Sequence, residues 1–542
     1  MITATTGTES LAQPGGALNA GFAFFVDCVV NLFILAALLR GTFGFPSEVV
    51  FGTIVPGCAV AILAGNVLLD LYTRTLVRQS GNQAMTTIPI GLDIATTFAM
   101  AFLILGPVYL ANEAELGAVA AGELAWQVGV AVTFWIGLIK LLYAQAGELI
   151  QRIVPTGAAM GTLSGIALAW MGAEAVLGIF QLPEIGLLAL GVMIYALMAG
   201  HRLPLKVPGA LAAIGLGTLL FYAIALSGLS PSYQLPLIKP LGTALPDFAL
   251  SAVLSSFDEN LIYLGVALPL ALLSSIGCIN IVRAALLVGD QYGTRSVLRI
   301  DAAATLIGAL FGGVVQTTAY LGHATYKRMG ARQTYTLVTG AVIVFLALGG
   351  GIGFAASAIP DAVLKSILIV VAADIVRVSF LSVESREAPS FLFALIPAVF
   401  ALCYSKLEVL FNRAAAEIST LGGDLVATLD FAYMDAYLIL GALSRGYILT
   451  SMVWATMVTC VIERRMLGAA TVALLCSGFS LVGLIHSVAP SSAMYLPWML
   501  DEFGRAAVLP WRFAGAYLLL ALLFLALSRI VPAQRTDAHG VH

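Results

Sequence analysis

Two short stretches of the chain share a polar pattern in the midst of apolar sequence. Residues 86–91 read TTIPIG and residues 317–322 read TTAYLG, so both follow Thr-Thr-x-x-aliphatic-Gly. Inside a bilayer, non-helical backbone is tolerated only where protein buries it or where it lines a wet cavity. We therefore predict that each stretch is a short extended segment leading into a half-helix, and that both face a cavity suited to a polar or anionic solute. The alternative is that the threonines bond back to their own helix and the glycines allow close packing.

A second group of candidates lies in the apolar run 260–288. There Asn280 and Arg283 are three residues apart and share one helix face, with two serines about two turns earlier. Together with residues of the two polar stretches, they make up the predicted substrate-binding set: Thr86, Thr87, Ser274, Ser275, Asn280, Arg283, Thr317, Thr318, Tyr320, Gly322 and His323.

Ionisable side chains inside apolar runs are costly and usually functional. The candidates for coupling to H⁺ or Na⁺ are Asp27, Asp93, Asp374 and His323. Asp27 faces Arg283 as an ion pair if the first and eighth runs are partners; alternatively, Arg283 reaches the cytoplasmic surface with its long side chain. His323 either carries a proton or is a neutral histidine bonded within the fold.

The elements that position these residues are predicted to be membrane-spanning helices. The chain is 60% hydrophobic and 10% charged, whereas roughly a quarter of the residues of a soluble protein are charged. Apolar runs of about 20 residues, long enough to cross a bilayer, recur along the chain. With a short sixth and a polar tenth span, the predicted spans lie near 19–40, 47–73, 92–111, 124–146, 156–180, 184–200, 206–227, 260–288, 300–315, 324–334, 335–353, 360–380, 388–404, 438–461, 467–487 and 511–530. We therefore predict an all-α polytopic membrane protein.

Composition also excludes several functions. The six cysteines show no CxxC spacing and the five histidines lie far apart, so we expect no metal site, no bound cofactor and no enzyme. A net charge of −3 gives no indication of nucleic-acid binding. With the amino terminus inside, sixteen Lys and Arg residues fall in inside segments and six in outside loops, which predicts that both termini are cytoplasmic.

The recurrence of the Thr-Thr pattern predicts an internal repeat. Each copy begins the third span of a set of seven, and an odd number of spans reverses the direction of the second copy across the membrane. We predict a first inverted repeat at 19–227, a second at 260–461 and two additional spans at 467–530.

The chain resembles the nucleobase/ascorbate transporter (NCS2) family, particularly bacterial xanthine/uracil permease-like members of the azaguanine type. The resemblance covers roughly residues 20 to 400 and rests on FGTIVPGCAVAILAGN (51–66), TTIPIGLDIATTFAMAFLILGPVY (86–109), PTGAAMGTLSGIAL (155–168), RLPLKVPGALAAIGLGT (202–218), SIGCINIVRAALLVGDQY (275–292) and QTTAYLGHATYKRMGAR (316–332). The last segment also looks similar to its equivalent in the SulP anion transporters, which share the fold.

The resemblance implies fourteen helices in two inverted sets of seven, divided into a core and a gate domain, with a short strand in the third and tenth spans. Substrate would bind between those strands, beside the first and eighth helices. The resemblance also implies a small-molecule substrate, a homodimer and a bacterial-type inner (plasma) membrane.

One departure from the family pattern bears on the substrate. Nucleobase symporters place carboxylates near the positions of Ser274 and Gly322 or His323, and neither position is acidic here. Asn280 and Arg283 also stand where acids are expected. This departure favours an anionic substrate. The main prediction is a secondary transporter of a nucleobase-like solute, purine, xanthine, uracil or an oxopurine anion, with or without proton coupling. The alternatives are a SulP-like transporter of a small anion or organic acid, and a transport-dead membrane sensor.

Overall fold

The computed structural model describes residues 16–201, 203–204, 209–236, 238, 241–255, 263–320, 322–420, 431–489 and 494–530. Within these ranges, nine helices are long and apolar enough to cross a bilayer, and two further helix pairs qualify when each is taken as one bent span. The predicted all-α multi-span membrane fold, with broken helices and short strands, is confirmed.

The chain divides into two compact units that interleave along the sequence. Unit 1 consists of Met1–Gly147, Ile238–Phe257 and Ser274–Ser357. Unit 2 consists of Glu148–Leu237, Asp258–Leu273 and Ala358–His542. Each unit therefore draws on both halves of the sequence, as the predicted core and gate domains would. The division into two sequence repeats stays a prediction.

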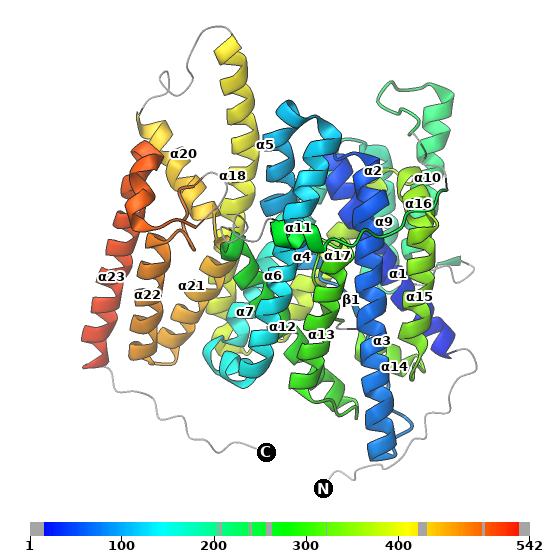
Figure 1. Ribbon diagram of the computed structural model, residues 1–542, viewed down its shortest axis with the longest axis horizontal. Coiled ribbons are helices and arrows are strands. Elements are labelled where there is room, and N and C mark those ends of the chain that lie inside the picture. Colours follow the sequence, from blue (N-terminus) through cyan, green and yellow to red (C-terminus); the bar gives the residue numbers. More distant parts are fainter. Residues whose placement is uncertain are drawn as a thin grey trace. The chain divides into compact units, whose positions relative to one another are not determined.

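Unit 1 is built from helices and a two-stranded sheet (Figure 1). Its elements are α1 (Gly16–Ala37), η1 (Leu38–Thr42), α2 (Ser47–Val49), η2 (Val50–Ile54), α3 (Val55–Ser80), β1 (Ile90–Leu92), α4 (Ile94–Met100), η3 (Ala101–Leu105), α5 (Gly106–Leu116), most of α6 (Ala118–Ile153), α11 (Leu250–Ser255), α12 (Leu264–Leu287) from Ser274 onward, α13 (Thr294–Leu310), β2 (Thr317–Ala319), α14 (His323–Arg328), α15 (Tyr335–Leu348) and α16 (Gly351–Ala358). The η segments are π-helical turns that continue the neighbouring helices. Helix α3 packs against α13 and α15, and α1 packs against α15.

Unit 2 is all-helical within the described ranges. Its elements are α7 (Thr156–Ile166), the π-helical η4 (Ala167–Ala173), α8 (Glu174–Ile179), α9 (Pro183–Met193), the π-helical η5 (Ile194–Met198), α10 (Gly209–Ser227), α17 (Asp361–Leu381), the 3₁₀ turn η8 (Ser385–Glu387), α18 (Ala388–Thr420), α20 (Phe431–Ser444), α21 (Tyr447–Ile462), α22 (Met466–Leu481), the 3₁₀ segment η9 (Pro497–Ala507) and α23 (Val508–Ser528). Helices α21, α22 and α23 lie side by side in Figure 1, and α22 packs against both of its neighbours.

Several predicted spans differ from the helices of the structure. The run 335–353 is a pair of helices bent by 75°, and the run 438–461 belongs to a pair bent by 78°. Glycines at positive φ stand at both bends, Gly350 (73°) and Gly446 (73°), where other residues are strained. The run 388–404 extends to Thr420, and the run 324–334 is helical only to Arg328, over the last five residues of the six-residue α14.

The two strands pair antiparallel and join segments more than 200 residues apart. The partners are Ile90 with Ala319, Gly91 with Thr318, and Leu92 with Thr317. The two Thr-Thr patterns stand at different places relative to the strands, because Thr317 lies in β2 whereas Thr86 precedes β1. Pro89 explains the offset. It accepts a hydrogen bond from the Tyr320 amide at 2.9 Å but has no N–H to donate, so the ladder stops short of the first threonine pair.

Candidate functional site

Strand β1 is anchored to α3 by one buried amide side chain. Asn66 Nδ2 donates to the Ile90 carbonyl at 2.7 Å, and the Ile90 amide donates to Asn66 Oδ1 at 3.0 Å. The same Nδ2 also donates to the Ile62 carbonyl within α3 at 2.7 Å. The N–H and C=O of Ile90 face away from β2, and Asn66 gives both of them a hydrogen-bond partner. Buried backbone groups need such partners.

Strand β2 is anchored by a buried ion pair. Lys140 Nζ in α6 lies 2.5 Å from Asp301 Oδ2 in α13, and both side chains are 0% exposed. The same ammonium donates to the Thr317 carbonyl at 2.8 Å, and Thr317 Oγ1 donates to Asp301 Oδ1 at 2.8 Å. An amide from α3 and a charge pair from α6 and α13 therefore fix the two strands independently.

Polar groups of unit 1 are accessible beside the strand pair, in the middle of apolar helices. The carboxylate of Asp27 in α1 is exposed and accepts a hydrogen bond from the Tyr326 hydroxyl. Asn31, one turn further along α1, donates to the hydroxyl of Tyr320. Tyr320 lies across Gly91, where a Cβ would collide with its ring, and is half-buried, as is Thr318. An exposed carboxylate on an apolar helix is costly against lipid, so polar surroundings suit this face of unit 1.

A second carboxylate stands where β1 becomes α4. Asp93 Oδ2 accepts from Thr96 Oγ1 at 2.5 Å and from Gln316 Nε2 at 3.2 Å, and its amide donates to the Gln316 carbonyl at 3.0 Å. No ion pair of the described residues includes Asp93. Asp93 and Asp27 are therefore acids held by neutral donors, which suits groups that gain and lose a proton or bind a cation.

A buried cluster joins the start of α14 to the α12–α13 connection. Asp290 accepts from His323 Nε2 at 2.9 Å and from Lys327 Nζ at 2.6 Å. The Thr86 amide also donates to Asp290, at 3.4 Å. Tyr292 donates its hydroxyl to the Thr86 carbonyl at 2.6 Å, and burial raises the pKa of this tyrosine, so the hydroxyl stays protonated. The cluster ties the segment before β1 to the helix after β2.

The first threonine pair is engaged by the protein itself. Thr86 Oγ1 donates to the Ala331 carbonyl at 2.8 Å, and Thr87 Oγ1 donates to Asp70 at 3.3 Å. Both threonines are fully buried, and Asp70 is itself paired with Arg74 at 2.7 Å. A direct contact of Thr86 and Thr87 with substrate stays a prediction. In this structure their hydroxyls form hydrogen bonds that fix the segment preceding β1. Of the four threonines, Thr318 is the accessible one.

The residues predicted in α12 also belong to unit 1. Ser274 and Ser275 are buried, Asn280 is half-buried and Arg283 is exposed. The Ser274 hydroxyl has no hydrogen-bond partner among the described residues. The predicted ion pair between Asp27 and Arg283 is not formed among the described residues. Helix α1 packs against α14 and α15, and the Asp27 carboxylate accepts a hydrogen bond from the Tyr326 hydroxyl instead.

Asp374 stands apart from the other candidates. It lies in α17 of unit 2, with 61% of its side chain exposed, and forms a 2.7 Å pair with Arg377 one turn away. Unit 1 contains every other predicted residue, and Gly322 directly precedes α14 there. Exposed helical pairs of this kind are common on protein surfaces and contribute little.

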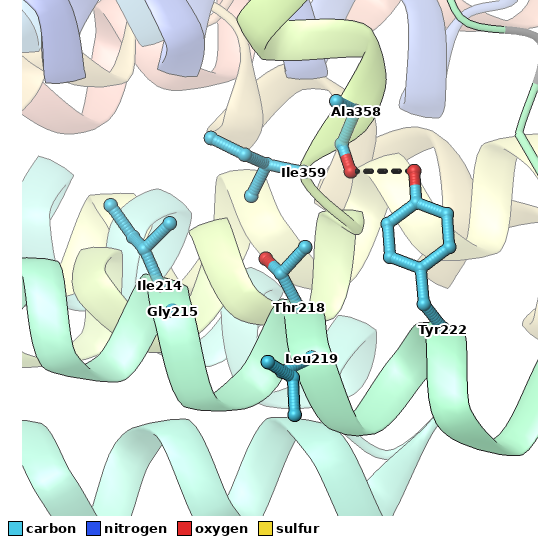
Figure 2. A pocket seen from close by; sticks show the side chains of 7 residues that line it. All are labelled: Ile214, Gly215, Thr218, Leu219, Tyr222, Ala358 and Ile359. Atoms are coloured by element: carbon cyan, nitrogen blue, oxygen red, sulfur yellow. Dashed lines mark hydrogen bonds between the residues drawn. The ribbon is translucent and has the colours of Figure 1, made fainter.

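A crevice in unit 2 does not fit a polar solute (Figure 2). It has a volume of about 400 Å³ and is lined by Ile214, Gly215, Thr218, Leu219, Tyr222, Ala358 and Ile359. Its one tyrosine hydroxyl already donates to the Ala358 carbonyl at 3.1 Å. Among the described residues no group of His, Cys, Asp and Glu is arranged to hold a metal ion.

Sequence reasoning missed the residues that hold the strands. Lys140 is the clearest omission, because a lysine in the middle of the apolar run 124–146 is the kind of residue that marks function in a bilayer. Asp301 and Asp290 lie near the ends of predicted spans, where acids are ordinary. Asn66 closes one of the quoted family-like segments, but only the structure shows that it faces β1.

No protein-family model matches the chain, and the comparison with curated proteins gives no match. Solved structures are similar in fold. One is the murine Solute Carrier 26 family member A9 anion transporter in the inward-facing state, with 13% identity and a TM-score of 0.51 over 73% of this chain and 68% of that one. Another structure of SLC26A9 gives 11% identity and 0.51 over 70% and 61%. The transmembrane domain of a cyanobacterium bicarbonate transporter, BicA, gives 18% identity and 0.48 over 72% and 96%.

The SLC26A9 structures show that this chain has an SLC26-like transmembrane fold. The fold class implied by the sequence resemblance is therefore confirmed. Membership of the nucleobase/ascorbate transporter family stays a prediction.

Proposed function

We propose that this chain is a secondary transporter that carries a small anion across the membrane together with H⁺ or Na⁺. The observation that carries the proposal is the polar face of unit 1, where Asp27, Asp93, Thr318 and Tyr320 surround two strands in the middle of apolar helices. A polar face at this depth needs a polar occupant. The choice of an anion is supported by the fold, which is shared with a protein described as an anion transporter.

The two carboxylates supply the reason for coupling. An anion about 4 Å from an ionised carboxylate is repelled by about 4 kcal/mol at the effective dielectric constant found near protein surfaces. A proton or Na⁺ on Asp27 or Asp93 removes that repulsion, so the anion and the cation favour each other's binding. Transport of both together follows from this mutual dependence.

A nucleobase-like solute, including an oxopurine anion, is the second candidate. Its support is a group of aromatic rings beside the same strands. Phe24 meets Tyr320, Tyr326 and Tyr335 edge to face, with ring centroids 5.7, 6.1 and 6.3 Å apart. Phe24, Tyr326 and Tyr335 are buried, so the half-buried Tyr320 is the ring that can pack against a planar base, and Asp27 or Asp93 can accept hydrogen bonds from the N–H groups of that base.

A thermal-shift screen followed by transport in proteoliposomes separates these candidates. A ligand that binds the native state raises its apparent stability. We expect chloride, sulfate or formate to stabilise the protein and to enter vesicles faster under an inward H⁺ or Na⁺ gradient. Stabilisation by uracil and xanthine alone would overturn the anion proposal in favour of the base. Binding without any transport would identify a sensor.

We also propose that the protein works as a homodimer in a bacterial-type inner (plasma) membrane, with both termini in the cytoplasm. The excess of basic residues in the predicted inside loops supports this orientation. Fluorescent and alkaline phosphatase fusions at each terminus test it, since the first is active only inside and the second only outside. Light scattering of the purified protein measures its oligomeric state.

A further inference from the structure

The cluster of Asp290, His323 and Lys327 contains a histidine nitrogen with no partner. His323 is 1% exposed and Asp290 is 0% exposed, while Lys327 keeps 18% of its side chain accessible. No described residue donates a hydrogen bond to His323 Nδ1 or accepts one from it. Buried polar atoms are nearly always paired, so an unpaired one needs a reason.

The contacts of the cluster fix the tautomer of the histidine. The ionised Asp290 can only accept hydrogen bonds, so His323 Nε2 must carry the hydrogen of the 2.9 Å contact. In the neutral ring, Nδ1 is then the bare acceptor. A proton can be added to Nδ1 without breaking any contact that holds the ring.

The charges around the ring determine the energetic cost of protonating His323. Asp290 and Lys327 neutralise each other at 2.6 Å, so the cluster has no net charge when His323 is neutral. The other titratable groups packed against it are the hydroxyls of Tyr292, whose ring meets the imidazole edge-on at 6.4 Å, and Tyr335, which interacts with Asp290; both are uncharged. Protonation of His323 therefore leaves one uncompensated positive charge in a buried place, which is costly.

An anion in the neighbouring site would offset that charge. The His323 amide donates to the Tyr320 carbonyl at 3.4 Å, so the ring is carried on the same short segment that lines the polar face of unit 1. We infer that His323 Nδ1 is a proton-binding site whose occupancy rises when an anion binds beside β2. This inference rests on the proposed anion transport and assigns part of the coupling to His323. Linkage is reciprocal, so a bound proton must tighten anion binding by the same factor.

Calorimetry of anion binding tests this directly on the intact protein. Chloride, sulfate and formate are suitable probes because none of them takes up a proton near neutral pH. Titration in two buffers of different ionisation heat counts the protons taken up with each anion. Over a series of pH values we expect a maximal uptake that approaches one proton, and an affinity that tightens up to about tenfold for each unit of falling pH.

The variant His323→Gln keeps a donor that can reach Asp290 but cannot take up a proton. Whatever the anion affinity of this variant, the number of protons taken up with each anion should fall by at least half. His486→Gln is the matched control, because His486 is also a 1% exposed histidine without a described Nδ1 partner, but in unit 2. It should leave the proton count unchanged.

The outcomes distinguish the two proposals. If none of the three anions binds at any pH, the proposed function fails and this inference falls with it. If an anion binds to the wild type without proton uptake, only the role of His323 is refuted. The same holds if His323→Gln retains the full uptake and Asp27→Asn or Asp93→Asn abolishes it. If His323→Gln fails to fold, a wild-type count of zero still refutes the role of His323, and so does an uptake that Asp27→Asn or Asp93→Asn abolishes.

Discussion

At the residue scale, the buried pair of Lys140 and Asp301 is expected to contribute strongly to the free energy of unfolding. Both are inaccessible, and the lysine also holds the Thr317 carbonyl. We predict that Lys140→Met lowers the free energy of unfolding by about 3–5 kcal/mol, because it leaves Asp301 charged and unpaired. Unfolding in mixed micelles with increasing SDS measures the change.

The double variant Lys140→Met, Asp301→Asn provides the control for that prediction. It removes the uncompensated charge while the asparagine can still accept a hydrogen bond from Thr317. It should therefore recover at least half of the lost stability. An equal loss in the single and double variants would show that the lysine acts through packing rather than charge.

The acids divide into two kinds at the residue scale. Asp93 is held by Thr96 and Gln316 beside the strands, whereas Asp374 lies in an exposed pair with Arg377. We predict that Asp93→Asn reduces gradient-driven uptake at least tenfold, because the site can no longer exchange a cation there. Asp374→Asn should change uptake less than twofold. Flux of labelled anion into proteoliposomes compares the two, and equal effects would contradict the assignment.

Residue types alone drew attention to the segments that form the strand pair. Threonine pairs, a tyrosine and a histidine stand out in an apolar chain because polar groups in a bilayer are exceptional, and the structure brings these segments together. The sequence could not show that Thr86 and Thr87 are occupied by Ala331 and Asp70, since those contacts join distant segments. The partners of an intramembrane polar residue are set by tertiary packing rather than by spacing.

At the scale of elements, α3 and the end of α13 approach backbone to backbone. A Cβ at Gly57 would collide with the main chain of Phe311, Gly312 and Gly313, which has no flexible end to move. We predict that Gly57→Ala destabilises the protein by about 1–3 kcal/mol through overpacking. Gly52→Ala is the control, because a Cβ there meets nothing within 4 Å. Thermal melting should separate the two variants, and equal melting temperatures would refute the close contact.

Element positions were predicted better than element shapes. Hydropathy located the helices of both units, since a span must be apolar over about 20 residues. It missed the bends at Gly350 and Gly446, because glycine inside an apolar run is equally compatible with a straight helix. The shared Thr-Thr-x-x-aliphatic-Gly pattern did not show that the strands are offset, because the offset depends on Pro89, which has no N–H to continue the ladder.

The strand pair provides a test at the scale of the whole molecule. Ile90 and Ala319 face each other, so cysteines at both positions should form a disulfide. In a Cys403→Ser background, which removes the one exposed native thiol among the six, we expect efficient cross-linking. With a protease site inserted between Pro231 and Ser232, the two fragments should stay joined until a reductant is added.

The matched control places the first cysteine at Ile88 instead of Ile90. That position lies outside the paired residues, so its Cβ is too far from residue 319 for a disulfide. Equal cross-linking at both positions would contradict the register and with it the geometry of the proposed site.

The interleaving of the two units has a consequence for biosynthesis. Lys140 leaves the ribosome 177 residues before Thr317, the strand residue that it holds. At typical elongation rates the gap lasts about 10 to 35 seconds. Until Asp301 is synthesised, the nascent helix lacks the acid with which Lys140 pairs in the folded protein. We therefore expect α6 to be held in the bilayer less firmly before α13 and β2 arrive than afterwards, since an unpaired lysine in a membrane helix is costly.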